Sequence, residues 1–415
     1  EVARTRTTCM NFQSIRSLAK PLLLWTTLVC VCIELVLRYK LCDLPYKFLN
    51  HTTGPIHKLG QYSKDEVIPK NYLAIVGDSN VYGFGPWLYD NSWSMEQPSF
   101  ATHHLLHASL KQDVVSFGYP GFGSLGSSLT MVSELQMLKN SWIWSRIEDP
   151  LEILFVFYEG NDLINNLHEV EQRGLDLHTI ESHTLDQKIA KIITDEERKL
   201  SESWAITHHS AAWNLFSGLT KNYYRKFYQD PIPDSLDLQS VPLAQPTVSQ
   251  AQDGSKPTNI ANISGIRVPL VFCEGPALLL NEMEISLSLK IMEHSLRYLR
   301  SNFPDSKISL IYLPSSLSIY DFGDCQVSPA SLEMMGKTRS DVFKPFDAIE
   351  SNRFLRAEVL KITQKTSIEF WDSTDYLRQI VRNKLLHGPR DPIHLNRAGY
   401  EAFTQGILSY LKPQS

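Results

Sequence analysis

Short apolar runs that end in turn residues alternate with amphipathic stretches along most of the chain. Runs of about four to eight apolar residues bounded by turns are typical of buried strands, and apolar residues recurring every three to four positions indicate helices. Strands that alternate with helices predict a parallel sheet with helices on both faces, as in doubly wound α/β proteins. The predicted strands are residues 72–76, 114–117, 151–158, 308–313 and 367–371, and the predicted helices are residues 100–110, 125–138, 284–301, 353–363 and 398–411.

The alternation breaks between about residues 164 and 279. Within this region, residues 186–204 have the pattern of an amphipathic helix rich in Lys and Glu. Residues 230–264 are crowded with Pro, Gln, Ser and Asp, and are expected to be loop or disorder. An irregular stretch of this length in a compact domain normally marks an insertion, a lid or a linker. We interpret residues 164–279 as a cap-like insertion between the third and fourth strands.

An apolar run lies near the N-terminus, at residues 21–37, and Glu34 is its only charged residue. The run is shorter than the roughly 20 residues of a comfortable membrane span. A membrane anchor, a cleaved signal peptide and a buried helix are the three alternatives. No small-x-small cleavage site follows the run, so we favour an uncleaved anchor. The expected division is a tail (1–20), an anchor (21–40), a tether (41–70) and one α/β domain (71–415).

The flanking charges bear on the side of the membrane. Arg16 and Lys20 precede the run, whereas Arg38, Lys40 and Lys47 follow it, and this near balance only weakly favours a cytoplasmic N-terminus. With that orientation the α/β domain would be extracytoplasmic, that is, periplasmic or extracellular.

The composition is that of an ordinary globular protein. The chain has 415 residues, of which 43% are hydrophobic and 20% charged, with a net charge of −5. Lys and Arg are scattered, so no basic stripe indicates a nucleic-acid partner. Of the six cysteines, only Cys273 and Cys325 lie beyond the N-terminal apolar region. These two could pair if the domain is extracytoplasmic, and the sequence does not decide it.

Four short motifs fall after predicted strands or just before the last predicted helix, where ligand sites lie in doubly wound sheets. Each motif alone has an ordinary structural interpretation: a strand-ending turn, a Gly-Pro turn, a helix N-cap and a chance Asp-x-x-His. The motifs are Gly77-Asp78-Ser79-Asn80, residues 117–123 (FGYPGFG), residues 158–162 (YEGND) and residues 391–396 (DPIHLN).

Together the four motifs supply distinct chemical roles in one order. A serine in a tight turn exposes its hydroxyl beside backbone N–H groups, as a nucleophile requires. An Asp three residues before a His can orient the imidazole, which then accepts the serine proton. A backbone N–H of the glycine-rich loop and an Asn amide can stabilise an oxyanion.

The order and spacing of these motifs resemble those of the SGNH (GDSL-like) hydrolase superfamily. The resemblance extends to membrane-anchored bacterial members, some of them linked to O-acylation of surface polysaccharides. It covers about residues 72–83, 113–126, 152–166 and 388–403. It implies the flavodoxin-like, three-layer α/β/α SGNH-hydrolase fold.

The resemblance also assigns roles to single residues. Asn80 stands where the GDSL name has Leu, and Ser116 stands where the second block of the family usually has Asn. Carried over by motif, the catalytic residues are Ser79 as nucleophile, His394 as base and Asp391 as the acid that orients His394. The oxyanion hole would consist of the Ser79 and Gly121 N–H groups and the Asn161 side chain.

The activity implied is that of a serine esterase or O-acyltransferase that forms an acyl-enzyme from acylated carbohydrates, without cofactor or metal. Its expected partners are an acyl-ester or polysaccharide substrate and a membrane. Hydrolysis and acyl transfer differ in whether water or a sugar hydroxyl reaches the acyl-enzyme. The sequence does not show which of the two the site admits, so both remain open. The alternative of another class is a catalytically inactive SGNH-like binding or assembly protein at a membrane. The intact Ser79, Asn161 and His394 argue against it.

Two further groups of side chains have competing interpretations. His103 and His107 are four residues apart on a predicted helix, a spacing that can bind a metal. No third ligand accompanies them in the sequence, so we expect a helix surface. Aromatic residues crowd positions 82–93 after the candidate nucleophile, where they either line an acyl pocket or pack in the core.

Overall fold

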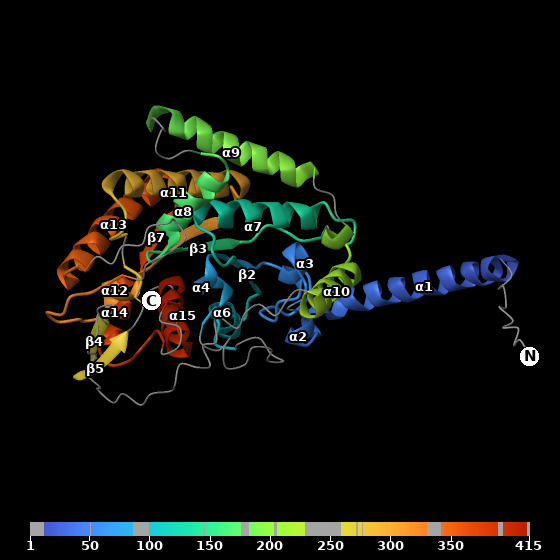
Figure 1. Cartoon of the computed structure of the whole chain (residues 1–415), viewed down its shortest axis with the longest axis horizontal. Coiled ribbons are helices and arrows are strands. Elements are labelled where there is room, and N and C mark those ends of the chain that lie inside the picture. Colours follow the sequence, from blue (N-terminus) through green and yellow to red (C-terminus); the bar gives the residue numbers. More distant parts are fainter. Residues whose placement is uncertain are drawn as a thin grey trace, which may run out of the picture.

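The computed structural model centres on a five-stranded parallel sheet in the order β2-β1-β3-β6-β7 (Figure 1). The strands are β1 (Leu73–Gly77), β2 (Val114–Gly118), β3 (Glu152–Tyr158), β6 (Lys307–Leu313) and β7 (Glu369–Asp372). All five were predicted within a few residues, and four of them, β1, β2, β3 and β6, are buried on both faces and therefore form continuous or nearly continuous apolar runs. The structure describes residues 12–49, 51–85, 99–144, 146–175, 182–202, 206–228, 259–270, 273–275, 277–329, 342–388 and 393–412.

Successive side chains of each strand serve two separate cores. In β1, Ala74 and Val76 lie in one core, whereas Leu73 and Ile75 lie in the other. Because side chains alternate across a strand, both faces of the sheet are covered. One face carries α7 (Ser124–Lys139), α8 (Asp162–Gln172), α11 (Glu282–Asn302) and α13 (Pro345–Lys365), and the other carries α6 (Thr102–Leu110), α14 (Thr374–Val381) and α15 (Arg397–Leu411) (Figure 1). The predicted doubly wound, three-layer α/β fold is confirmed.

The strand order reverses beside β1. β1 pairs with β2 on one side and with β3 on the other, so the chain crosses from one half of the sheet to the other between them. In doubly wound sheets ligands bind at such a switch point, at the carboxyl ends of the strands. Residues 77–80 directly follow β1 and residues 158–162 follow β3, so the first and third motifs meet at this point.

The region predicted as an insertion contains regular elements. Its first residues belong to α8, which buries Leu167 and Val170 in the core of the sheet. The predicted amphipathic helix is present as α9 (Ser182–Glu202), and η2 (Ile206–His208) and α10 (Ala211–Tyr228) follow it.

The end of the predicted loop forms a strand instead. β4 (Asn259–Ile263) pairs antiparallel with β5 (Ile266–Leu270), and its buried and exposed residues alternate. The polar residues of this short strand concealed the alternation. Residues 230–258, the main part of the loop prediction, lie outside the described residues.

Residues 41–70 pack onto the domain and do not form a separate tether. They contain η1 (Leu41–Asp43), α2 (Tyr46–Leu49) and α3 (Gly54–Leu59), and Leu41, Ile56 and Leu59 are buried in the first core. Gln61 covers the edge of β2: its side chain accepts from the Ser116 N–H and donates to the Ser116 carbonyl, both at 2.8 Å. A covered edge strand cannot pair with another chain.

The N-terminal apolar run forms α1 (Phe12–Lys40). Glu34, the charge within the run, caps α10. It accepts from Ser210 Oγ at 2.7 Å and from the N–H groups of Ala211 and Ala212 at 2.9 and 3.0 Å. A carboxylate at a helix N-terminus is stabilised by the unpaired N–H groups and the helix dipole.

Among the described residues, no helix combines the length and the apolar character that crossing a membrane requires. The anchor over residues 21–40 therefore stays a prediction. Cys273 and Cys325, whose pairing the sequence left open, are both free thiols.

The histidines next to the first core predict a loss of stability in acid. Burial lowers the pKa of His57 and of His104 to about 4, from 6.5, and the Lys58 charge contributes at His57. As pH falls from 6.5 to 4 the unfolded chain binds these protons and the folded chain does not. The free energy of unfolding therefore decreases across this window, by about 2 kcal/mol for each histidine.

We expect His57→Gln to have a shallower pH dependence of stability than the wild type between pH 6.5 and 4. Urea unfolding followed by tryptophan fluorescence at half-unit pH steps measures it. Parallel curves for the two proteins would contradict the assignment of this titration to His57.

Candidate active site

Ser79 lies at the turn between β1 and the short helix α4 (Ser79–Tyr82). Gly77 ends the strand against its neighbour, since a Cβ there would lie 2.9 Å from the Val156 carbonyl oxygen. Asp78 caps α4, with its carboxylate accepting the Asn80 N–H at 2.9 Å, and Ser79 Oγ lies 3.4 Å from Asp78 Oδ2. The sequence Gly-Asp-Ser therefore forms this turn for steric and capping reasons.

His394 meets Ser79 across almost the whole chain. His394 Nε2 lies 2.9 Å from Ser79 Oγ, although the two residues are 315 positions apart. The Phe84 ring contacts the imidazole edge-on at a centroid distance of 5.7 Å. The Phe84 carbonyl in turn accepts from the Tyr400 hydroxyl on α15. An imidazole nitrogen at this distance from a hydroxyl can accept its proton.

Asn396 closes the base of the loop that carries His394. Its side-chain amide donates to the carbonyl oxygens of Leu385, His387 and Gly388 at 3.1, 3.2 and 3.3 Å. Its Oδ1 accepts the Gly399 N–H at 3.0 Å and so caps α15. One side chain thus joins the start of the last helix to the segment before the loop. Asp391, predicted to orient His394, lies outside the described residues.

Asn161 is buried between the end of β3 and the start of α8. It therefore lies at the carboxyl-terminal edge of the sheet, as Ser79 does. Its side-chain amide lies close enough to the carboxyl group of Asp78 to lower the pKa of that group. Burial raises the pKa of Asp78, and the Asn80 N–H, the nearby His394 and the Asn161 amide oppose this rise. The first, third and fourth motifs therefore meet around Asp78, which lies near Asn80 of the first motif, Asn161 of the third and His394 of the fourth.

The second motif forms the turn after β2. The Tyr119 N–H donates to the Gly77 carbonyl at 2.9 Å, so this turn begins beside the first motif. Gly118 approaches α4 so closely that a Cβ there would lie 2.1 Å from the Tyr82 nitrogen. Gly121 is exposed and has a φ of +79°, a conformation that favours glycine.

Two buried carboxylates hold the turn that carries Gly121. Glu134 on α7 accepts the Tyr119 hydroxyl at 2.7 Å. Glu169 on α8 accepts the Gly123 and Gly126 N–H groups, each at 2.8 Å. Burial raises the pKa of Glu169, and these two hydrogen bonds lower it. The conformation of the turn therefore depends on α7, which follows β2, and on α8, which follows β3.

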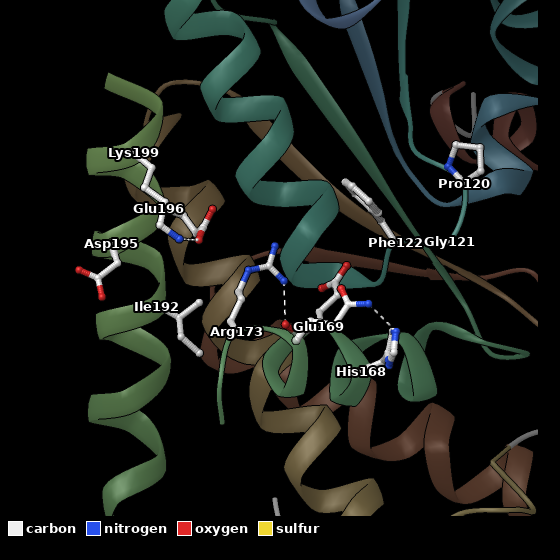
Figure 2. A pocket seen from close by; sticks show the side chains of 11 residues that line it. Pro120, Gly121, Phe122, His168, Glu169, Arg173, Ile192, Asp195, Glu196 and Lys199 are labelled. Atoms are coloured by element: carbon white, nitrogen blue, oxygen red, sulfur yellow. Dashed lines mark hydrogen bonds and ion pairs between the residues drawn. The ribbon is translucent and has the colours of Figure 1, made fainter. Parts of the chain in front are cut away.

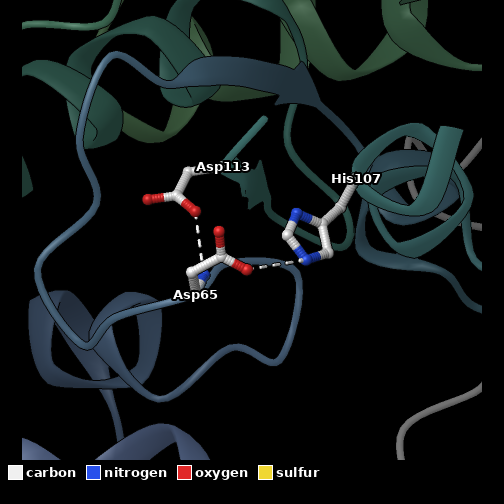
Figure 3. Close-up of side chains that lie close together, drawn as sticks. All are labelled: Asp65, His107 and Asp113. Atoms are coloured by element: carbon white, nitrogen blue, oxygen red, sulfur yellow. Dashed lines mark hydrogen bonds and ion pairs between the residues drawn. The ribbon is translucent and has the colours of Figure 1, made fainter. Parts of the chain in front are cut away.

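The histidines of α6 do not form the pair that their spacing suggested. His103 is buried and its ring lies tilted against that of His104 at a centroid distance of 4.4 Å, whereas we expected a helix surface. Burial lowers the pKa of His103 well below the usual range. His107 lies apart, with Nε2 3.8 Å from Asp65 Oδ1 and with Asp113 nearby (Figure 3).

The side chains of Asp65, His107 and Asp113 come close enough to surround a cation. The Asp113 carboxylate already accepts the backbone N–H groups of Asp65 and Lys70, at 2.8 and 2.9 Å. Asp65 itself is highly exposed. We interpret this group as a clamp that fixes residues 65–70 against the start of β2.

The residues that hold the site escaped sequence reasoning. Glu169 and Tyr400 are ordinary helix residues in the sequence, and no local pattern marks them. Asn396 could have been found, because an Asn directly before a predicted helix is a typical N-cap. Phe84 belongs to the aromatic group that we left open between pocket and core, and it contacts the candidate base.

Comparisons with known proteins give weak similarity. No family model and no curated protein matches the chain. A carbohydrate acetylesterase family member from Sinorhizobium meliloti overlaps 82% of this chain and 96% of its own, with a TM-score of 0.31 and 8% identity. Two other crystal structures overlap 82% of this chain and 96% and 95% of theirs, with TM-scores of 0.33 and 0.31 and identities of 10% and 12%. Similarity of this size does not assign a function, which must be argued from the residues.

The role of Asn396 predicts a graded series of variants. Asn396→Ala loses the helix cap and the three hydrogen bonds across the loop, whereas Asn396→Ser keeps a capping oxygen. We expect the alanine variant to lose about 2 to 3 kcal/mol in free energy of unfolding and the serine variant about 1 kcal/mol less. Urea unfolding measures both. Equal losses in the two variants would show that the cap on α15 contributes nothing. An alanine variant as stable as the wild type would refute the role of Asn396 in holding the loop.

Proposed function

We propose that the protein is a serine-dependent acyl-ester hydrolase or O-acyltransferase that acts through an acyl-enzyme. The observation that carries this proposal is the 2.9 Å contact between Ser79 Oγ and His394 Nε2. A serine and a histidine in direct contact are found in many proteins. Here the serine occupies a tight turn at the switch point of a doubly wound sheet, where such folds bind ligands.

In the first half-reaction, His394 Nε2 accepts the proton of Ser79 as its oxygen attacks the acyl carbonyl carbon. The negative charge that develops on the carbonyl oxygen would be stabilised by the N–H groups of Ser79 and Gly121 and by the Asn161 amide. His394 then donates its proton to the leaving alcohol, and the acyl group remains as an ester on Ser79. Asp391 has the role of orienting the imidazole and stabilising its protonated form.

In the second half-reaction, water or a sugar hydroxyl attacks the acyl-enzyme while His394 accepts its proton. The proton then returns to Ser79, and a free acid or a new ester is released. Acylated carbohydrates are the substrate class that the SGNH resemblance supports. Attachment to a membrane through residues 21–40, with the domain outside the cytoplasm, belongs to the same proposal and is supported by the apolar run.

Labelling with a fluorophosphonate probe tests the nucleophile. We expect the wild-type protein to react at Ser79 and Ser79→Ala to remain unlabelled. Ester hydrolysis should fall at least about 10³-fold in Ser79→Ala and in His394→Ala, because the two residues act as a unit. Mass spectrometry of the labelled peptide and p-nitrophenyl acetate hydrolysis measure these effects.

Ser127→Ala is the matched control, since Ser127 is also buried and its hydroxyl donates to the Gly77 carbonyl beside the turn. A folded wild-type protein that neither labels nor cleaves the ester would exclude the enzyme. Repeating the assay with a polysaccharide acceptor then separates transfer, which forms a new sugar ester, from hydrolysis.

Asn161→Ala tests the oxyanion role. If the amide stabilises the transition state, kcat should fall about 10²- to 10³-fold with little change in KM. Thermal unfolding of the same variant gives the structural cost of losing the contact with Asp78. A loss of activity that follows only the loss of folded protein would contradict the catalytic role.

A further inference from the structure

A cavity of about 600 Å³ lies between α8 and α9, with one end at the turn that carries Gly121 (Figure 2). Pro120, Gly121 and Phe122 form that end, and polar side chains of the two helices form the walls. Its volume is within the range of about 300 to 1,000 Å³ typical of small-molecule sites. The fold itself does not require this cavity, because α9 lies outside the helices that cover the sheet.

The helix α9 directs Ile192, Glu196 and Lys199 toward the cavity, and their spacing of three and four residues places them on one side of the helix (Figure 2). Asp195, at the edge of this side, points away from the cavity and pairs with Arg198 at 3.2 Å. The earlier turns of the same side attach the helix to the domain: Leu185 and Ile189 are buried in the first core, and Ile192 packs against it. Asp186 adds ion pairs with Lys290 and His294 of α11, at 2.9 and 2.7 Å.

The opposite wall comes from α8, and it supplies the same mixture of groups. His168, Glu169, Gln172 and Arg173 line this wall. One guanidinium N–H of Arg173 donates to the Glu169 carbonyl at 2.8 Å, and an arginine carries four more donors. On the α9 wall, Lys199 and Glu196 of the same helix form an ion pair at 2.6 Å.

This lining excludes most ligand classes and favours one. An acyl chain would take the Lys199–Glu196 ion pair and the remaining Arg173 donors out of water without replacing their hydrogen bonds to water, which is costly. A polyanion would meet the carboxylates of Glu196 and Glu169. A neutral ligand with many hydroxyls can both donate to the carboxylates and accept from Arg173 and Lys199. The half-buried Phe122 ring at the mouth offers a flat apolar surface of the kind on which a sugar ring packs.

The cavity also lies near enough to the candidate active site for one oligosaccharide to reach both. α8 starts directly after Asn161, and His168 follows seven residues later, which is about 10 Å along a helix. Gly121 also lines the cavity and is part of the proposed oxyanion hole, so the two proposed sites share the turn after β2. We infer that this cavity binds the neutral sugar units next to the acylated one and thereby selects an oligosaccharide ester as substrate. This inference rests on the proposed function.

Kinetics on two substrates test the inference. p-Nitrophenyl acetate is too small to reach the cavity from Ser79, whereas partly O-acetylated xylo-oligosaccharides of two to four sugars can occupy it. We expect Lys199→Ala and Glu196→Ala to shift the ratio of the two kcat/KM values about tenfold against the oligosaccharide, mainly through KM. Lys188→Ala is the matched control, since Lys188 is exposed on α9 and does not line the cavity.

Binding of the same oligosaccharides to Ser79→Ala, measured by calorimetry, is a second readout that needs no turnover. We expect the added Lys199→Ala substitution to weaken it about tenfold. An unshifted kinetic ratio, or a wild-type protein that cleaves p-nitrophenyl acetate but neither binds nor deacetylates the oligosaccharides, overturns the inference and leaves the proposed function standing. A wild-type protein that cleaves no ester at all overturns the proposed function itself.

Discussion

The contact between Ser79 and His394 is the constraint on which the rest of the site depends. The serine belongs to the turn after the first strand, and the histidine belongs to a loop before the last helix. Neither segment can fix this distance by itself. β1 and α15 bury Ile75 and Tyr400 in the same core, so the packing of the second face of the sheet sets the distance. Asn396 and Tyr400 then remove the remaining freedom of the loop and of Phe84.

Buried carboxylates also hold the turns of this site in place. Asp78, Glu134 and Glu169 are each buried, and each has a raised pKa because burial disfavours its charge. Each one also accepts hydrogen bonds from a turn or loop of the site, which offsets the cost of burial. A buried carboxyl group with directed partners fixes a backbone more narrowly than an apolar side chain does. We infer that they hold the turns, whereas the proposed chemistry belongs to Ser79 and His394.

Local physics explains how much of this was predictable from the sequence. Strands such as β3 are buried on both faces and therefore form nearly continuous apolar runs in the sequence. The turn at Gly77 and the sequence DPIHLN can be recognised from their residue types. Contacts between distant segments leave no such signal. Gln61 covers the edge of β2 through backbone groups of Ser116, and nothing near residue 61 in the sequence indicates it. For the same reason residues 41–70 looked like a tether.

The helix α8 joins the proposed chemistry to the proposed selection of substrate. Its N-terminus follows Asn161, its Glu169 holds the turn of Gly121, and Arg173, one turn later, lines the cavity. Ligand contacts with Arg173 and the hydrogen bonds that fix the oxyanion turn therefore belong to one rigid element. On these proposals, binding energy from sugars remote from the ester would hold the ester beside the reacting groups, which lowers KM for large substrates. If both proposals hold, the position of α9 above this helix matters for catalysis on large substrates and not on small ones.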